Sequence, residues 1–131
     1  MARILIIEDN AANMQLMAYL LNAFGHTVLE AVNGRTGLAT ALQARPDIVL
    51  CDLQMPGMDG YEVVRRFKHD PDLIDVPLVA VTAYAMVGDR DKILAAGFDG
   101  YIPKPINPEI FVGEVEGFLP CTKHADDQQD I

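Results

Sequence analysis

The sequence is poor in positive charge. Its 131 residues include 10 lysines and arginines against 19 aspartates and glutamates, so the net charge is −9 and the isoelectric point lies near 4.5. Proteins that bind nucleic acid by releasing its counterions need clustered lysine and arginine side chains. The shortage of these side chains therefore argues against nucleic acid as a partner.

Long apolar runs and cysteines are also scarce. No apolar run approaches the roughly 20 residues that cross a bilayer, so we expect a soluble protein without membrane insertion. The run at Ile4–Ile7 is short, and no small-residue cleavage site of a signal peptide follows it. Cys51 stands in an apolar stretch and Cys121 in a polar one, which favours reduced thiols over a disulfide framework. These absences predict a cytoplasmic location.

What the sequence does contain is a regular alternation of apolar runs and helix-like stretches. Half of the residues are hydrophobic, and the length suits one domain, which we place at residues 1–120. Continuous apolar runs, unlike alternating ones, are typical of parallel strands covered on both faces. The predicted strands are Ile4–Ile7, Val28–Val32, Ile48–Cys51, Leu78–Val81 and Tyr101–Ile102.

Helical patterns fill the intervals between these strands. The predicted helices are Asn13–Ala23, Gly34–Ala44, Tyr61–Lys68, Met86–Ala95 and Pro108–Phe118. Five alternating units predict an α/β fold of (βα)5 type, most simply a flavodoxin-like, doubly wound sheet of five parallel strands in the order 2-1-3-4-5. The final segment, residues 121–131, is polar and acidic without periodicity, which predicts a disordered tail.

Five polar residues stand at the carboxyl ends of the predicted strands. Glu8 and Asp9 follow the first strand, Asp52 follows the third, Thr82 the fourth and Lys104 the fifth. Carboxylates at one sheet edge repel one another unless a cation is bound, and such oxygen ligands suit Mg²⁺. With that charge neutralised, Asp52 could attack a phosphoryl donor and form an aspartyl phosphate. Thr82 could then donate a hydrogen bond to the phosphoryl oxygens, and Lys104 could supply positive charge.

Each of these residues alone has a simpler explanation. An isolated Asp9 is more often a helix cap or a loop charge, an isolated Thr82 is a strand residue, and an isolated Lys104 is a surface cation. Their joint occurrence at matching strand ends outweighs those explanations. By the same reasoning, Asp59 is predicted to cap the third helix and Cys51 to lie in the core. The three histidines are too dispersed to indicate a metal site, and no function is predicted for them.

The stretches that carry these residues resemble the response regulator receiver family. The resemblance spans about residues 3 to 119 and is strongest at Ile6–Asn10, Asp52–Gly60, Val81–Ala83 and Lys104–Pro105. It implies that Asp52 is the phosphoacceptor, that Asp9 binds Mg²⁺ directly, and that Glu8 binds it partly through water. It also implies a cis peptide bond between Lys104 and Pro105.

The resemblance further implies roles for backbone groups and one aromatic ring. The Gln54 carbonyl oxygen would bind the metal, and the backbone of Gln54 and Ala83 would contact the phosphoryl group. The Tyr101 ring would turn inward when Thr82 moves towards that group, which describes a two-state switch. Simple packing of the Tyr101 ring in a short strand remains the alternative.

The first predicted helix is apolar around more than one face. Leu16, Leu20 and Phe24 repeat at four-residue spacing and are predicted to face the core. Met14 and its apolar neighbours have two readings that stay open. They could be buried as well, or they could form a docking strip for the helix bundle of a histidine kinase or phosphotransferase.

Three functions share this set of residues. The preferred one is a stand-alone two-component signalling switch that accepts a phosphoryl group from a histidine kinase or phosphotransferase. It would catalyse only its own phosphorylation and dephosphorylation, and would act on an effector protein, on a second copy of itself, or by onward transfer. A phosphohydrolase with the same nucleophile would be expected to have a second aspartate where Gln54 stands. A binding module that has lost phosphorylation is disfavoured by the complete set of site residues.

Overall fold

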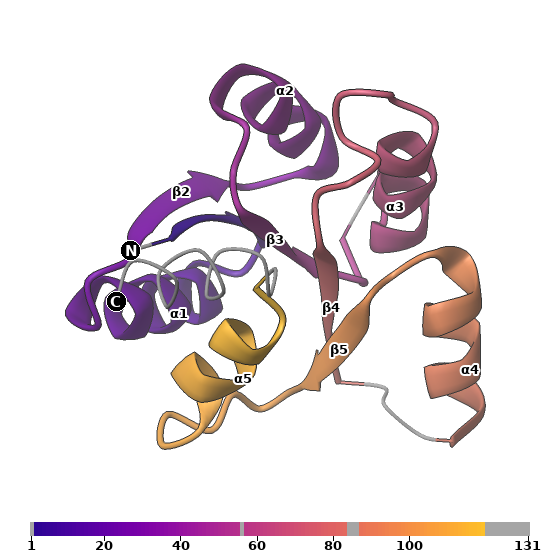
Figure 1. Ribbon diagram of the computed structural model, residues 1–131. Coiled ribbons are helices and arrows are strands. Elements are labelled where there is room, and N and C mark those ends of the chain that lie inside the picture. The colour runs from indigo at the N-terminus through magenta and orange to yellow at the C-terminus, as the bar shows by residue number, and fades with distance from the viewer. Residues whose placement is uncertain (1, 56, 84–86, 120–131) are drawn as a thin grey trace, which may run out of the picture.

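The computed structural model describes residues 2–55, 57–83 and 87–119, and within them five strands and five helices alternate along the chain (Figure 1). The strands are β1 (Arg3–Ile7), β2 (Thr27–Ala31), β3 (Ile48–Asp52), β4 (Leu78–Thr82) and β5 (Gly100–Pro103). The helices are α1 (Ala11–Ala23), α2 (Gly34–Ala44), α3 (Gly60–Lys68), α4 (Val87–Ala96) and α5 (Phe111–Gly117). The predicted tail and the predicted helix start at Met86 lie outside the described residues.

All five strands are parallel, and their order in the sheet is β2-β1-β3-β4-β5, as predicted. Every residue of the central strands β3 and β4 is buried, as expected for strands covered on both faces. Helices α1 and α5 cover one face of the sheet, and α2, α3 and α4 cover the other (Figure 1). No helix in the described part of the chain has both the length and the apolar character of a bilayer span.

Side-chain caps fix where α1, α2 and α3 begin, and the cap of α2 is Asn33, whose side chain accepts a hydrogen bond from the Thr36 N–H (2.8 Å). Asn10 accepts a hydrogen bond from the Asn13 N–H (2.9 Å), so α1 starts two residues earlier than the apolar pattern predicts. Asp59 accepts one from the Glu62 N–H (3.0 Å), which confirms its predicted role as the cap of α3. A cap of this kind stabilises a protein by about 1 kcal/mol.

Helix α5 begins later than predicted, at Phe111 instead of Pro108. The carbonyl oxygen of Asn107 accepts hydrogen bonds from the N–H groups of Ile110 (3.2 Å) and Phe111 (3.0 Å), and its side chain accepts one from Glu109 (3.1 Å). These bonds hold residues 108–110 in a turn, although the prediction assigned them to the first turn of the helix.

The inward face of α1 differs from the predicted one. The buried side chains of the helix are Met14, Met17, Ala18 and Leu21. Their spacing of three, four and seven residues follows the helical period, whereas a strict four-residue repeat drifts around the helix axis. Leu16 and Leu20 are partly buried and pack at the edge of the core, whereas Phe24 is 63% exposed, so the predicted core face was wrong at Phe24 and only partly right at the two leucines. Because Met14 is only 5% exposed, it forms no docking strip.

One buried histidine joins distant parts of the chain, although no role was predicted for it. His26 accepts a hydrogen bond at Nδ1 from the Ala2 N–H (3.1 Å), and its Nε2 lies 2.8 Å from Oε2 of Glu116. Since Nδ1 accepts, Nε2 carries the proton and donates to the carboxylate. This contact fastens α5 to the edge of the sheet where β1 begins.

Candidate functional site

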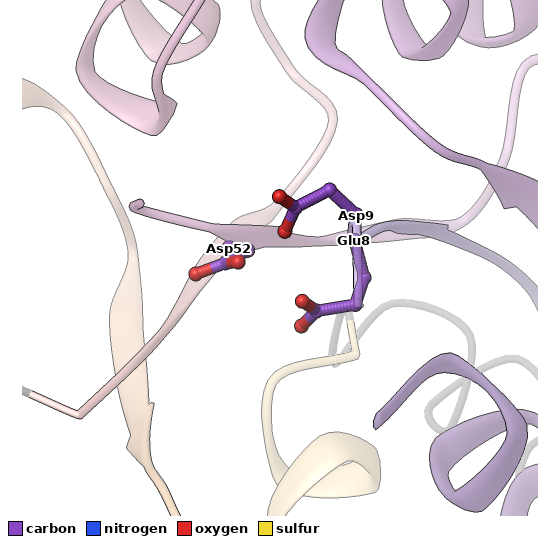
Figure 2. Close-up of side chains that lie close together, drawn as sticks. All are labelled: Glu8, Asp9 and Asp52. Atoms are coloured by element: carbon purple, nitrogen blue, oxygen red, sulfur yellow. The ribbon is translucent and has the colours of Figure 1, made fainter. Parts of the chain in front are cut away.

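Three carboxylates meet at one edge of the sheet. Glu8 and Asp9 directly follow β1, and Asp52 is the last residue of β3, the neighbour of β1. Because both strands end at the same edge, one carboxylate oxygen from each residue lies within 4.8 Å of the others (Figure 2). Glu8 and Asp52 are buried, at 1% and 4% exposure, while Asp9 is exposed. The cluster thus has two buried members and one that faces solvent.

Lys104 supplies the positive charge nearest to this cluster. Its Nζ lies 3.2 Å from Oε1 of Glu8 and 3.3 Å from Oδ1 of Asp52. The Lys104–Pro105 peptide bond is cis, as the resemblance implied. The backbone of Lys104 is tied to the end of β4, since its N–H donates to the Thr82 carbonyl oxygen (2.7 Å). One cation therefore compensates two buried carboxylates at once.

Backbone N–H groups hold the two buried carboxylates in place. The Gln54 N–H donates to Oδ1 of Asp52 (3.1 Å), and the Asn10 N–H donates to Oε2 of Glu8 (3.2 Å). The other Glu8 oxygen, Oε1, is buried and accepts no hydrogen bond from the described residues, although Lys104 is its ion-pair neighbour. A buried acceptor without a hydrogen bond costs free energy.

The electrostatics of Glu8 show how crowded the negative charge is. Burial, together with the hydrogen bond and the charge of Asp52, raises the pKa of Glu8 from 4.5 to about 7. Lys104 and the Asn10 N–H oppose this rise but do not cancel it. Without a further cation, a large share of the folded molecules therefore holds Glu8 protonated at neutral pH, where an ordinary glutamate is ionised.

The residues present fit a hard divalent cation. Three carboxylates contributed by two adjacent strand ends offer the oxygen ligands that Mg²⁺ prefers. The hydrogen-bond-free Oε1 of Glu8 and the raised pKa of this residue are both expected where two buried carboxylates share the charge of one lysine. Gln54, the predicted backbone ligand, lies two residues beyond Asp52 and is exposed.

The two residues predicted to contact a phosphoryl group end the neighbouring strand. Thr82 is the last residue of β4 and is fully buried, and Ala83 follows it and is exposed. In the pairing of β3 with β4, Asp52 is opposite Val81, the residue before Thr82. The predicted partners of Asp52 therefore lie at the same edge of the sheet.

Tyr101, the predicted switch residue, contacts a cation of α4. Its ring is half-buried against the apolar cluster beneath α3 and α4, and the guanidinium carbon of Arg90 lies 5.8 Å from the ring centroid. A second pair of the same kind stands next to it, with Nζ of Lys92 5.0 Å from the centroid of Tyr61. Sequence reasoning missed both contacts, because neither cation is adjacent to its ring along the chain.

Comparisons with known proteins agree with this architecture. The family model of the response regulator receiver domain matches residues 4–116. Among curated proteins, the polar-differentiation response regulator DivK of Brucella anthropi is 39% identical over 116 residues, which cover 88% of this chain and 94% of DivK. DivK of Brucella ovis is 37% identical over the same length.

Solved structures show the same fold. The chemotaxis response regulator CheY4 of Vibrio cholerae superposes with a TM-score of 0.86 at 29% identity, covering 91% of this chain and 99% of that one. The receiver domain of a sensor histidine kinase from Pseudomonas aeruginosa has a TM-score of 0.81 at 30% identity, with coverages of 89% and 96%. That structure holds a magnesium ion in its active site cleft.

Proposed function

The chain belongs to the response regulator receiver domain family and acts in two-component signalling, and we propose that phosphorylation of Asp52 is what switches it. The observation that carries this proposal is the position of Asp52. Its carboxylate lies close to those of Glu8 and Asp9 and 3.3 Å from Nζ of Lys104, at the sheet edge where β4 also ends. An acceptor needs this combination of cation ligands and a fixed positive charge.

The metal-binding part of the proposal assigns Mg²⁺ to Glu8, Asp9, Asp52 and the Gln54 carbonyl oxygen. The relative from Pseudomonas aeruginosa holds magnesium in its cleft, and the acidic cluster described above has the matching donor chemistry. When bound, the ion would neutralise the carboxylates and the oxygens of the incoming phosphoryl group.

The transfer itself would use the side chains around Asp52. A carboxylate oxygen of Asp52 would attack the phosphorus of a phosphohistidine, and the bond from phosphorus to the histidine nitrogen would break. The Thr82 hydroxyl and the Ala83 N–H would donate hydrogen bonds to the phosphoryl oxygens. Hydrolysis of the aspartyl phosphate in the same site would reset the protein.

Lys104 has a second task in this scheme. Its Nζ already lies within 3.3 Å of both Glu8 and Asp52, so it needs only a short displacement to pair with a phosphoryl oxygen on Asp52. The released charge on Glu8 would then be balanced by the metal. The ion pairs seen here would thus belong to the unphosphorylated state of the switch.

The signal would leave the site through Thr82 and Tyr101. Movement of Thr82 towards the phosphoryl group would make room for the Tyr101 ring, and the surface of α4, β5 and α5 would change. Membership of the receiver family implies that a histidine kinase or phosphotransferase donates the phosphoryl group and that an effector protein binds the switched surface. A cytoplasmic location and a second copy of the chain as a partner belong to the same proposal.

Phosphotransfer profiling tests this function. Purified histidine kinases of the source organism, and their phosphotransferases, are loaded with radioactive phosphate and mixed with the chain and Mg²⁺. We expect one or a few donors to label the wild-type chain within seconds and to leave Asp52→Asn unlabelled. If no donor labels the wild type, the signalling role through phosphorylation is wrong.

A further inference from the structure

A groove between α2 and α3 stands apart from the acidic site. Its volume is about 610 Å³, which lies within the 300–1,000 Å³ range of small-molecule sites. Helix α2 contributes Leu38, Ala39 and Leu42 to its wall, and Arg66 and His69 of α3 and its C-terminal cap line the other side. Nothing in the proposed phosphorylation chemistry uses these side chains.

An apolar strip forms one wall of the groove. Arg35, Leu38, Ala39 and Leu42 follow one another at spacings of three, four and seven residues, so they share a face of α2. Leu38 is only half-buried, and Leu42 remains 43% exposed. Met58, from the loop before α3, adds a further apolar side chain. This wall offers an apolar surface that the domain itself leaves partly open to water.

The groove continues towards the start of α2. A second hollow of about 290 Å³ shares Arg35 and Met58 with the first, and it reaches Gly34 and Thr36 in the first turn of the helix. The N-terminus of a helix carries partial positive charge. Arg35 therefore lies between the apolar wall of the groove and the N-terminus of α2, which adds partial positive charge.

The charge of the groove is opposite to that of the whole chain. With a net charge of −9 overall, the described lining nevertheless contains two arginines, Arg35 and Arg66, against one carboxylate, Asp70. Arg35 forms no ion pair with any described residue, whereas Nε of Arg66 lies 2.8 Å from Glu62. Asp70 is engaged with the backbone, since its Oδ1 accepts a hydrogen bond from the Asp72 N–H (2.9 Å).

We propose that the α2–α3 groove binds an organic anion with an apolar ring body. The wall of Leu38, Leu42 and Met58 would hold the rings, and the guanidinium groups of Arg35 and Arg66 would pair with the anionic group. The groove also includes Met58 of the loop that leads from Asp52 into α3. Binding there does not depend on phosphorylation, so this inference stands or falls separately from the proposed function.

The probe for a direct test is 8-anilinonaphthalene-1-sulfonate, which combines fused rings with a sulfonate. Titration of the full chain is followed by fluorescence, and two-dimensional amide NMR locates the probe. We expect saturable one-to-one binding with the largest amide shifts at Leu38, Leu42 and Met58. Largest shifts at Tyr19 and Phe24, the exposed rings of α1 and its cap, would instead overturn the proposal.

Matched variants and a matched ligand separate a built site from simple hydrophobic adsorption. Arg35→Gln and Arg66→Gln should each weaken binding about tenfold, the usual loss for one charge-assisted hydrogen bond. Arg65→Gln is the control, because Arg65 also pairs with Glu62 but does not line the groove. N-phenyl-1-naphthylamine, which lacks the sulfonate, should bind more weakly to the wild type. Equal binding of the two ligands, or equal effects of all three variants, would contradict an anion site.

Discussion

Nζ of Lys104 lies 3.3 Å from Oδ1 of Asp52, and both side chains are largely removed from solvent. The same Nζ is 3.2 Å from Glu8, so the lysine forms one centre of positive charge for two buried carboxylates. Such a buried group of charges is sensitive to the loss of any member, because the remaining charges are left without compensation.

Replacing Lys104 with methionine should therefore destabilise the magnesium-free protein by roughly 3 kcal/mol, the usual cost of leaving a buried charge unpaired. Urea denaturation in the presence of a chelator measures this free energy of unfolding. The double variant Lys104→Met with Asp52→Asn should regain part of the loss, since it removes one of the uncompensated carboxylates. If Lys104→Met lowers the free energy of unfolding equally in the wild type and in Asp52→Asn, the Lys104–Asp52 ion pair contributes nothing to stability.

The raised pKa of Glu8 predicts how stability depends on pH when no metal is present. The folded state holds the Glu8 proton more tightly than the unfolded state, because the pKa is about 7 in the fold and 4.5 without it. The contribution of this carboxyl to stability should therefore fall as the pH rises from about 4.5 to 7. Glu8→Gln, which cannot ionise, should lack this component, as urea denaturation at several pH values would reveal.

Magnesium should reverse this trend. Because the cation binds the ionised carboxylates, added Mg²⁺ should raise the free energy of unfolding more at pH 8 than at pH 5. In Glu8→Gln the magnesium effect should be smaller at pH 8. An equal magnesium effect at both pH values in the wild type would contradict the assignment of Glu8 as a ligand.

Gly60 should be the glycine that tolerates alanine least near the site. A Cβ atom there would lie 2.8 Å from both the Asp52 carbonyl oxygen and Cα of Leu53, and these backbone atoms cannot move without shifting the end of β3. We expect Gly60→Ala to cost about 2 kcal/mol and to weaken magnesium binding. Thermal unfolding and magnesium titration measure the two effects.

Gly113 provides the matched control for that substitution. It lies on the exposed side of α5, and no described atom beyond its chain neighbours and the nearby backbone of its own helix comes within 4 Å of an added Cβ. Gly113→Ala should therefore stabilise the protein by about 0.5–1 kcal/mol through helix propensity. If both alanine variants behave alike, the close approach at Gly60 has no energetic weight.

Arg90 should influence the switch through the ring of Tyr101. A cation over an aromatic face contributes about 0.5–1 kcal/mol at a partly exposed site, and that contact would be lost when the ring turns inward. Arg90→Ala should therefore move the amide shifts of β5 towards their phosphorylated positions before any phosphodonor is added. Lys92→Ala, which removes the cation over the Tyr61 ring instead, should leave the β5 amide shifts unchanged. Unchanged β5 shifts in Arg90→Ala would remove Arg90 from the switch.

Much of the fold could be predicted because its signals are local. Each strand was predicted within one residue of its bounds, since a buried parallel strand is a continuous apolar run between polar ends. The convergence of Glu8, Asp9 and Asp52 followed from the same rule, because parallel strands end at one edge. The start of α5 escaped prediction because the Asn107 turn depends on backbone hydrogen bonds that composition does not reveal.

Contacts between distant elements were the part that the sequence did not reveal. His26 and Glu116 are 90 residues apart, and only the packing of α5 against the edge of the sheet brings them together. The burial of Met14 depended on which helical face meets the sheet, and the double ion pair of Lys104 depended on distances between the ends of β1, β3 and β5. The α2–α3 groove arises in the same way, from two helices that pack side by side.

The central claim is that Asp52 accepts a phosphoryl group, and intact-mass spectrometry tests it most directly. The chain is incubated with acetyl phosphate and Mg²⁺, and the mass is recorded before the acyl phosphate hydrolyses. The wild type should gain the mass of one phosphoryl group, and this gain should vanish in Asp52→Asn and in the presence of a chelator. A phosphoryl adduct of equal abundance on Asp52→Asn would contradict the assignment of Asp52 as the acceptor.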